Sequence, residues 1–579
     1  MQTEKLKYEQ CLTTVRDRLS GLREEDVEQG IIDYVFGTES KDKPVNKVLA
    51  SLSLPRHIDT IVSLFGKLLD YRQIQAHGIV FTPKYIADYI VSQVFSDLDC
   101  WRDDIKILDP GCGCGVFLLS AMEYLNKKFG VSPQELVQNN LYGFDIEPNN
   151  VRRCKKILFS VSGAEGNIYC CDALRKDWAD YKLSEADYII GNPPYINFHN
   201  LTPDTALLLR QSFRTMESGN GNVFYAFIEK SFCNLSNNGR VGFIVPNNFF
   251  FIKAATKLRK YLKEEKCLCS ILDFRENFVF DSAKTYSCVL LLDKKNPDVL
   301  QYATMQKTED IQKALENISY SAISKNHLDE YGWKLLSTEE YDNIKRIESQ
   351  AITLRPLIRG GIATLNDAVF MGTKEVESEI LRPIFKVPEL KTREISDAKK
   401  QIIFPYREKN GKMELIPEVE MQEKYPKAYA YLLSQKELLD ARDNGKSNAA
   451  GWYAYGRTQG LMQHGSKILF PTFSVRPRFI KIDDPFVLHC NGYAVLENDS
   501  LELDVLCRIL NSNVMQYYIS RTSYLIKGGY YCYQKKYLGK FSIPEFTSQE
   551  KEEILKMESQ QLNAFLWGKY QLTGEWNMV

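Results

Sequence analysis

The stretch that decides the fold is ILDPGCGCGVFL, residues 107–118, in which a short apolar run enters a glycine-rich turn and then a helix. In α/β proteins such turns lie at the carboxyl end of a strand, where ligands bind, and glycine lets the backbone approach a ligand closely. The spacing after Asp109 and Pro110 is GxGxG, which differs from the GxGxxG of dinucleotide-binding turns. The turn is therefore a candidate ligand loop, with a plain tight turn as the alternative.

Further apolar runs around this turn have the length and composition of buried strands. They lie at residues 105–108, 141–144, 188–190, 241–245 and 287–292, and helical segments separate them. Alternation of strands and helices favours a mostly parallel, doubly wound sheet. We therefore expect an α/β fold for this part of the chain.

The length of 579 residues predicts two to four domains. Residues 1–75 have apolar positions at helical spacing and predict a small helical subdomain. Residues 76–300 carry the strand and helix alternation, and residues 301–345 are polar and charged, which suits a linker containing a helix. Residues 346–579 mix strand-like and helical patterns and predict a second, α+β domain.

Composition excludes several classes of protein. Hydrophobic residues at 44% and charged residues at 26% are typical of a globular chain. Lysine plus arginine equals aspartate plus glutamate at 74 each, so a nucleic-acid partner would need a local basic face. The polar N-terminus and the lack of a long apolar run predict no membrane segment and a cytoplasmic location. The 14 cysteines and 6 histidines are scattered without ligand spacing, so we expect reduced thiols and no metal site.

Acidic residues follow the next two strand-like runs. Asp145 and Ile146 end the second run, where a carboxylate can accept hydrogen bonds from ribose hydroxyls, and Asp172 and Ala173 end the third, where the acid can accept from an adenine amino group. Each acid alone is more often a helix cap. With Asp109, three acids at successive strand ends favour a nucleoside site.

The box Asn192-Pro193-Pro194-Tyr195 ends the fourth run and carries the chemistry. Proline has a fixed φ and no amide donor, so the backbone carbonyl of Pro193 can be held outward beside the Asn192 side-chain carbonyl. Two such carbonyls can accept both hydrogens of one amino group and localise its lone pair as the nitrogen attacks. Tyr195 offers a ring on which a planar base can stack. The alternative, a loop that merely ends a strand, is weakened by the glycine turn that precedes it.

The box and the glycine turn, together with HGIVFTPKYIA at residues 77–87, resemble the gamma class of type II N6-adenine DNA methyltransferases, the TaqI-like and Eco57I-type restriction–modification methylases. In that class the Thr-Pro motif precedes the glycine turn, the catalytic box follows it, and target recognition lies C-terminal, as here. The resemblance implies a Rossmann-like methyltransferase domain that uses S-adenosyl-L-methionine and a C-terminal target-recognition domain. It also implies double-stranded DNA as the partner and the N6 amine of a flipped adenine as the methyl acceptor.

The resemblance also implies site residues. Asn192 and Pro193 would hold the target amine, and Tyr195 would stack on the flipped adenine. Pro194 completes the catalytic box. Phe280 matches a second aromatic of the family against that base, with a core phenylalanine as an equal alternative. The cofactor-binding residues implied are Thr82, Pro83, Asp109, Pro110, Gly111, Gly113, Gly115, Asp145, Ile146, Asp172 and Ala173.

The C-terminal region supplies candidates for DNA contact. Residues 505–544 contain six lysines or arginines and neither aspartate nor glutamate, which suits phosphate contacts. The alternative is a basic surface with aromatic residues packed beneath it. The candidates for base or backbone contact are Arg457, Arg476, Arg478, Lys527, Tyr530, Tyr531, Lys535 and Lys536.

Two other functions stay open on sequence alone. Release-factor glutamine methyltransferases share the glycine turn and the Asn-Pro-Pro-Tyr box, although they lack the Thr82-Pro83 motif and a large C-terminal reader. A non-catalytic DNA specificity subunit would not need intact motifs. The sequence leaves open whether a separate restriction endonuclease accompanies the protein, and a monomer is the default expectation.

Overall fold

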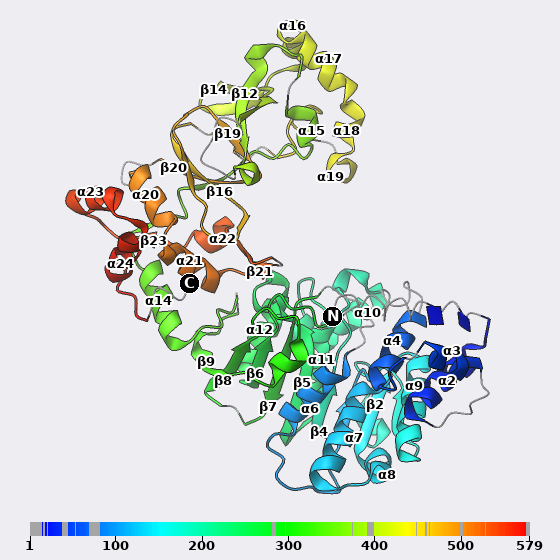
Figure 1. Cartoon of the computed structure of the whole chain (residues 1–579). Coiled ribbons are helices and arrows are strands. Elements are labelled where there is room, and N and C mark those ends of the chain that lie inside the picture. Colours follow the sequence, from blue (N-terminus) through cyan, green and yellow to red (C-terminus); the bar gives the residue numbers. More distant parts are fainter. Residues whose placement is uncertain are drawn as a thin grey trace. The chain divides into compact units, whose positions relative to one another are not determined.

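The computed structural model divides the chain into two compact units, which are described separately (Figure 1). Unit 1 is Met1–Ser337 and unit 2 is Thr338–Val579. The residues described are 14–15, 18–19, 21–37, 44–52, 54–68, 82–280, 285–295, 297–330, 332–372, 374–390, 399–446, 448–457, 460–462, 464–497, 502–526 and 528–574.

Unit 1 is built on a nine-stranded sheet of spatial order β3-β2-β1-β4-β5-β7-β6-β8-β9. Neighbouring strands from β3 to β5 are parallel, as are β6 and β8, whereas β7 is antiparallel to both neighbours and β9 is antiparallel to β8. The predicted, mostly parallel sheet is confirmed. The strands are β1 (Ile107–Asp109), β2 (Leu141–Asp145), β3 (Asn167–Cys170), β4 (Ala186–Gly191), β5 (Leu235–Pro246), β6 (Leu268–Asp273), β7 (Ser287–Asp293), β8 (Val299–Thr304) and β9 (Ser321–Ser324).

Helices cover both faces of this sheet, as the burial along β4 shows. Ile190 packs in an apolar cluster with Ile86 and Leu118, whereas Ile189 packs in a second cluster with Ile228. Successive side chains of a strand point to opposite faces, so the two clusters lie on the two sides of the sheet. The helices of unit 1 are α2 (Glu24–Phe36), α3 (Pro44–Ser51), α4 (Ile58–Leu68), α6 (Lys84–Val94), α7 (Val116–Phe129), α8 (Pro133–Glu135), α9 (Pro148–Ser162), α10 (Pro203–Ser212), α11 (Phe224–Cys233), α12 (Thr256–Glu264) and α13 (Ile311–Leu315).

The N-terminal helices α2, α3 and α4 share the core of unit 1. Ile31 and Phe65 are fully buried, and both belong to the same apolar cluster as Ile157 of α9. Helix formation in the described part of residues 1–75 follows the predicted pattern. These helices pack on the α/β part and share its hydrophobic core.

The stretch 301–345, expected to be a linker, contains sheet strands. β8 pairs in parallel with β6, and β9 closes the edge against β8. Leu300 and Ala303 of β8 are buried in the two apolar clusters on opposite faces of the sheet, whereas Val299 and Gln301 are exposed. That half-polar pattern reads as a linker in the sequence, and the boundary between the units falls at Ser337.

Unit 2 has α+β composition, with short and mainly antiparallel strands. Its helices are α14 (Thr338–Glu348), α15 (Asp367–Phe370), α16 (Glu418–Lys424), α17 (Pro426–Ser434), α18 (Lys436–Asp440), α19 (Arg442–Gly445), α20 (Leu503–Leu510), α21 (Asn513–Thr522), α22 (Lys535–Leu538), α23 (Ser548–Lys556) and α24 (Ser559–Lys569). Its strands are β10 (Ile352–Thr353), β11 (Ile358–Gly360), β12 (Leu381–Lys386), β13 (Lys399–Ile403), β14 (Tyr406–Lys409), β15 (Lys412–Leu415), β16 (Lys467–Pro471), β17 (Phe473–Ser474), β18 (Ile480–Ile482), β19 (Leu488–Cys490), β20 (Gly492–Leu496), β21 (Leu525–Ile526), β22 (Tyr530–Cys532) and β23 (Ser542–Ile543).

The strands of unit 2 form several small sheets. One has the order β11-β20-β16-β18, a second β13-β12-β19, and a third β17-β22-β21. Leu469 and Ala494 belong to one apolar cluster, while Phe370, Ile403 and Tyr455 belong to another. Unit 2 therefore has hydrophobic cores of its own, apart from that of unit 1.

Candidate active site

The glycine turn joins β1 to α7 and is tied to the end of β2. The backbone N–H of Cys112 donates to the carbonyl of Phe144 at 2.8 Å, and the N–H of Gly113 donates to Asp145 Oδ2 at 2.9 Å. Gly115 has φ of +89° as helix α7 begins, a conformation that side chains disfavour. The predicted loop and the predicted second strand end therefore meet, as a parallel sheet requires.

Asp109 lies buried at the end of β1, only 1% exposed. Its Oδ1 accepts from the N–H of Gly111 at 3.1 Å. Burial raises the pKa of Asp109 to about 8, with a smaller contribution from the neighbouring charge of Asp145. A cationic group bound nearby would favour the charged carboxylate, which suits a sulfonium ligand.

Asp145 and Ile146 follow one another at the end of β2, beside the glycine turn. The Asp145 carboxylate accepts from the N–H of Gly113 and, at 2.8 Å, from the N–H of Glu147, while Asn150 Nδ2 donates to it at 3.3 Å. Burial raises the pKa of Asp145 above its ordinary value. The Ile146 side chain is 58% exposed directly beside this acid, an apolar surface against which a base can pack. Contact of Asp145 with a ribose, and of Ile146 with the cofactor, stays a prediction.

Asp172 closes a turn after β3. Its Oδ1 accepts from the N–H of Leu174 at 3.0 Å, and Oδ2 pairs with Arg175 at 3.1 Å. The carbonyl of the adjacent Ala173 accepts from the indole of Trp178 at 2.9 Å. The helical turn that follows is capped by Asp177, so the helix-cap alternative for Asp172 is wrong, and contact with an adenine amino group stays a prediction.

The Asn-Pro-Pro-Tyr box leaves β4 immediately beside Asp109. A Cβ built on Gly191 would lie 2.6 Å from Asp109 Oδ1, so only glycine fits between the strand and the box. Asn192 Nδ2 donates to Thr82 Oγ1 at 3.1 Å, which joins the box to the predicted Thr-Pro motif 110 residues away. Pro83 caps the start of α6. Three motifs that are distant in sequence thus converge on one place.

Three aromatic rings lie together at the end of the box. The Tyr195 ring meets Phe224 and Phe280 edge to face, at centroid distances of 6.2 and 6.3 Å. Its hydroxyl donates to the carbonyl of Ile244 at 3.1 Å, and burial raises the Tyr195 pKa well above its ordinary value. Phe280 is 3% exposed. Phe224 was not assigned from sequence, and its place in the segment NVFYAF at residues 222–227 is the signal that could have found it.

Four of the predicted DNA-contact residues gather around the small sheet β17-β22-β21 of unit 2. Ser474 pairs with Tyr531, and Tyr530 pairs with Ile526 on the same sheet. Arg476 follows β17 and is exposed, and Tyr530 is 44% exposed. Arg478 is half-buried, and burial lowers its pKa. Lys527 lies outside the described residues.

Three other candidates lie elsewhere in unit 2. Lys535 opens the short helix α22 and donates through Nζ to the carbonyl of Ile358 at 2.9 Å. Lys536 is exposed, with its Nζ 4.5 Å from the centre of the Tyr537 ring. Arg457 pairs with Asp443 at 3.1 Å. The structure therefore does not bring all the predicted DNA contacts into one cluster.

Two cations of the basic stretch 505–544 are structural. Arg508 donates to the carbonyls of Leu555 and Met557 at the end of α23. Arg521 pairs with Glu340 at 3.0 Å and stacks on the Tyr517 ring at 4.0 Å. The packed-surface alternative therefore holds for these residues.

The described residues contain neither a group of metal ligands nor a membrane-spanning helix. Within the ranges that the structure describes, no three histidine, cysteine, aspartate or glutamate side chains are grouped so as to hold a metal ion. Over those same ranges, every helix is too short or too polar to span a lipid bilayer.

Comparisons with known proteins agree with this site. A family described as N-6 DNA Methylase matches residues 59–346. The Type II methyltransferase M.BstVI of Geobacillus stearothermophilus is 25% identical over 531 residues, which cover 83% of this chain and 92% of that protein. The Type II restriction enzyme and methyltransferase RM.Eco57I of Escherichia coli is 23% identical and covers 74% of this chain, and the alignment spans 52% of that enzyme.

Among solved structures, the Type IIL restriction–modification enzyme MmeI in complex with DNA matches this fold. The TM-score is 0.62 at 16% sequence identity, covering 92% of this chain and 82% of that one. The match supports the fold of the chain. The family match and the type II methyltransferase relatives, together with the motif order and the sheet described above, identify the chain as a gamma-class, adenine-specific type II DNA methyltransferase that uses S-adenosyl-L-methionine.

Proposed function

We propose that unit 1 transfers a methyl group from S-adenosyl-L-methionine to the N6 amine of an adenine rotated out of duplex DNA, and that unit 2 selects the surrounding sequence. One observation carries this proposal. The Asn192 side chain is bonded to Thr82, while Gly191 packs against Asp109 at a distance that excludes a larger residue. The box that would hold the amine therefore adjoins the loop that would hold the cofactor.

The residues of the pocket fit the cofactor. Asp145 and the exposed Ile146 would hold the nucleoside, and Asp109 with the backbone of Gly111 and Gly113 would surround the methionine part. Thr82, which accepts a hydrogen bond from Asn192, would lie beside the methionine part of the cofactor. When bound, the cofactor supplies a methyl group on a positively charged sulfur, and no metal is needed for its transfer.

The box residues act on the amine. The bond from Nδ2 to Thr82 orients the Asn192 amide so that Oδ1 accepts from the amine, and the carbonyl of Pro193 accepts its second hydrogen. The hydrogen bonds to both acceptors strengthen as the nitrogen becomes positive, so they stabilise the transition state more than the ground state. The bond between the amine nitrogen and the methyl carbon would form as the carbon–sulfur bond breaks. The positively charged amine would then release one proton to water.

Base rotation explains the aromatic rings. The amine of a paired adenine is inside the stack, and extruding the nucleotide costs a few kcal/mol. The Tyr195 ring, fixed by its hydroxyl bond to Ile244, offers a stacking surface that returns about 1–3 kcal/mol. Phe280 at the edge of that ring would enclose the same base.

The test is to express the protein in a host without DNA methylation and to sequence its DNA by a single-molecule method. We expect N6-methyladenine at one short motif, abolished by Asn192→Ala and kept by Asn317→Ala, an exposed asparagine after α13. Absence of any modified base, with S-adenosylmethionine still bound by the purified protein, would overturn the DNA assignment and point to a protein or RNA amine.

We extend the proposal to one copy of the chain acting on DNA beside a separate restriction endonuclease. The Type II methyltransferase M.BstVI, which aligns over 92% of its length, supports a stand-alone methylase. Light scattering of the protein with a duplex containing the methylated motif should give one protein per duplex, and a ratio of two would contradict it. Cloning of the neighbouring genes and an assay for cleavage at the methylated motif test the endonuclease.

A further inference from the structure

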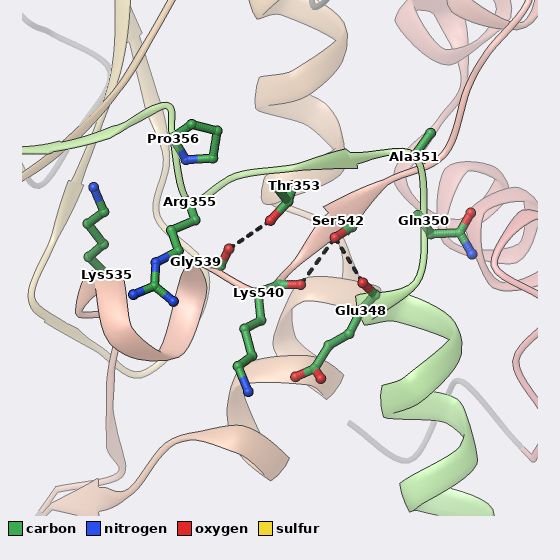
Figure 2. A pocket seen from close by; sticks show the side chains of 10 residues that line it. All are labelled: Glu348, Gln350, Ala351, Thr353, Arg355, Pro356, Lys535, Gly539, Lys540 and Ser542. Atoms are coloured by element: carbon green, nitrogen blue, oxygen red, sulfur yellow. Dashed lines mark hydrogen bonds between the residues drawn. The ribbon is translucent and has the colours of Figure 1, made fainter.

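Two adjoining hollows in unit 2 share the side chain of Lys535. The first, of about 700 Å³, is drawn in Figure 2 and lies between α14, β10 and α22. The second, of about 680 Å³, continues along β11. The residues that line the first are Glu348, Gln350, Ala351, Thr353, Arg355, Pro356, Lys535, Gly539, Lys540 and Ser542. We call the two together the Lys535 groove.

Positive charge dominates this groove. Its cations are Arg355, Arg359, Lys412, Lys535 and Lys540, all exposed except Lys535, which is half-buried. Its one acid in the described lining is Glu348, whose Oε1 accepts from the hydroxyl of Tyr518 at 3.0 Å. Figure 2 shows Arg355 and Lys540 extending on the same side of the loop.

The backbone holds two of these cations together. The carbonyl of Ile358 accepts both from Lys535 Nζ, at 2.9 Å, and from Arg359, at 3.2 Å. Gly539 lets Arg355 approach α22, because a Cβ there would lie 3.3 Å from Arg355 Cβ. Burial lowers the pKa of Lys535, and so do the charges of Arg359 and Arg355. Like charges held this closely are unfavourable alone and favour a bound anion.

We propose that the Lys535 groove binds the sugar–phosphate backbone of the substrate DNA. This rests on the proposed function, which makes duplex DNA the substrate. Five cations along two joined hollows exceed what one free phosphate would need, so a polyanion with successive phosphates fits best. The contacts would be independent of the DNA sequence, since backbone phosphates are the same at every base pair.

The experiment measures affinity for a duplex against salt concentration, with and without the target motif. Arg355→Ala with Lys540→Ala should lower the salt slope by about two and weaken binding to both duplexes about equally. The matched control is Lys446→Ala with Lys556→Ala, two exposed lysines of unit 2 that do not line the groove. The control should keep the wild-type slope.

Three outcomes are decisive. An unchanged slope in the groove variant overturns the proposal, as does a loss confined to the duplex that contains the motif. A thermal unfolding profile of the variant that matches the wild type confirms that unit 2 is folded, so a misfolded protein is not mistaken for support. Failure of the proposed function would be separate, because the wild-type protein itself would then leave DNA unmethylated.

A different observation carries a second inference, about the N-terminal helices. Glu28 of α2 is fully buried, and its carboxylate pairs with Arg153 at 2.5 Å and with Arg152 at 2.9 Å, both on α9. Arg153 is 1% exposed and lies 4.9 Å from the ring of Phe65 on α4. A buried carboxylate with two arginines fixes the position of one helix against another.

Helix α9 also contacts the glycine turn and the acid at the end of β2. Asn150, three residues before Arg153, donates to the Asp145 carboxylate at 3.3 Å. Cys154 Sγ lies where a Cβ on Gly115 would be only 2.6 Å away. Within five residues, one helix therefore touches the N-terminal segment, the ribose acid and the glycine turn.

We infer that Glu28 is a positioning residue for the cofactor, acting through α9 on Asp145 and Gly115. Glu28→Gln keeps the shape of the side chain and removes the charge. We expect KM for S-adenosylmethionine to rise about tenfold, which corresponds to one charged hydrogen bond. The kcat at saturating cofactor and KM for DNA should stay within about twofold.

Two controls make the test selective. Glu25→Gln alters a neighbouring glutamate that is 67% exposed and 3.7 Å from Arg152, and it should leave all constants unchanged. Glu28→Asp keeps the charge and should restore most of the cofactor affinity. An unchanged KM for the cofactor, or equal changes in KM for cofactor and DNA, would overturn the inference; a purely structural role would lower the melting temperature without this selectivity.

Discussion

The two units hold their predicted functional residues in opposite ways. In unit 1, Asp109, Asp145 and Asn192 are buried or half-buried, and hydrogen bonds fix each of them. In unit 2, Arg476 and Lys536 are exposed at separate places. The chemistry of methyl transfer needs reacting atoms held at a defined separation, whereas contact with a long polyanion can be shared among many weak partners.

This difference predicts different responses to mutation. A single change in unit 1 should remove a step, because no neighbouring group can replace the displaced atom. A single change in unit 2 should reduce affinity in small increments. Four experiments test this comparison, in decreasing order of expected effect.

Gly191→Ala should have the largest effect. The new Cβ would collide with Asp109 Oδ1 at 2.6 Å and displace either the box or the cofactor loop. A shift of about 1 Å can lower a rate about 100-fold, so we expect at least that loss in kcat/KM, measured by incorporation of labelled methyl groups. Gly568→Ala, a helical position with nothing within 4 Å, is the control and should retain activity. Activity within threefold in Gly191→Ala would show that the close contact is dispensable.

Tyr195 separates the ring from its hydroxyl. Tyr195→Phe loses the bond to the carbonyl of Ile244, which is worth about 1 kcal/mol, and should keep kcat/KM within about tenfold. Tyr195→Ala also loses the stacking surface, worth about 1–3 kcal/mol per base, and should fall further by about 10- to 100-fold. Equal losses in both variants would assign the role to the hydroxyl and would contradict base stacking.

Asp109 should make stability depend on pH. Its pKa is raised to about 8 by burial, while the unfolded chain releases this proton near pH 4. The folded protein therefore binds the extra proton, and stability falls as pH rises from about 4 to about 8. Asp109→Asn removes this loss, so its melting temperature should exceed that of wild type by a margin that grows over that range. Differential scanning fluorimetry across the range checks this, and a constant margin would contradict the buried, protonated carboxyl.

Two arginines of unit 2 should give the smallest and most contrasting effects. Arg476→Ala removes an exposed cation and should weaken DNA binding a few-fold without changing the melting temperature. Arg521→Ala breaks the pair with Glu340 and the stacking on Tyr517, so it should lower the melting temperature and leave DNA affinity near wild type. Anisotropy titrations with thermal denaturation distinguish them. The reverse pattern would mean that Arg521 contacts DNA and that Arg476 is structural.

One physical regularity lets the sequence predict which strand ends of unit 1 meet. Parallel strands end at the same edge of a sheet, so Asp109 at the end of β1 and Gly191 at the end of β4 lie side by side once the strands are recognised. The role of Asp172 is less accessible, since an acid that closes a turn and one that contacts a ligand need the same residue at the same place. The sequence predicts a linker over residues 301–345 because β8 and β9 are short and carry polar side chains, with β9 at the edge of the sheet.

Prediction fails in unit 2 for the opposite reason. A sequence lists Arg508 and Arg521 beside Lys536, but only the structure tells which cation is satisfied by a carbonyl or a carboxylate. The Lys535 groove combines Arg355, Lys412 and Lys540, which come from three separate segments. Residues that act together only through tertiary contacts leave no local signal.

The thiol of Cys154 behind the glycine turn gives the enzyme an internal reporter. Cys112, Cys114 and Cys154 are buried around this turn, whereas Cys100, Cys170 and Cys233 are exposed. A thiol reagent should modify the exposed group at once and the buried group only when the turn opens. Because other buried cysteines also react slowly, peptide mass spectrometry that follows the three thiols around the turn measures the frequency of local opening. Its retardation by ligand would then follow occupancy of the pocket in real time, without a label and without turnover.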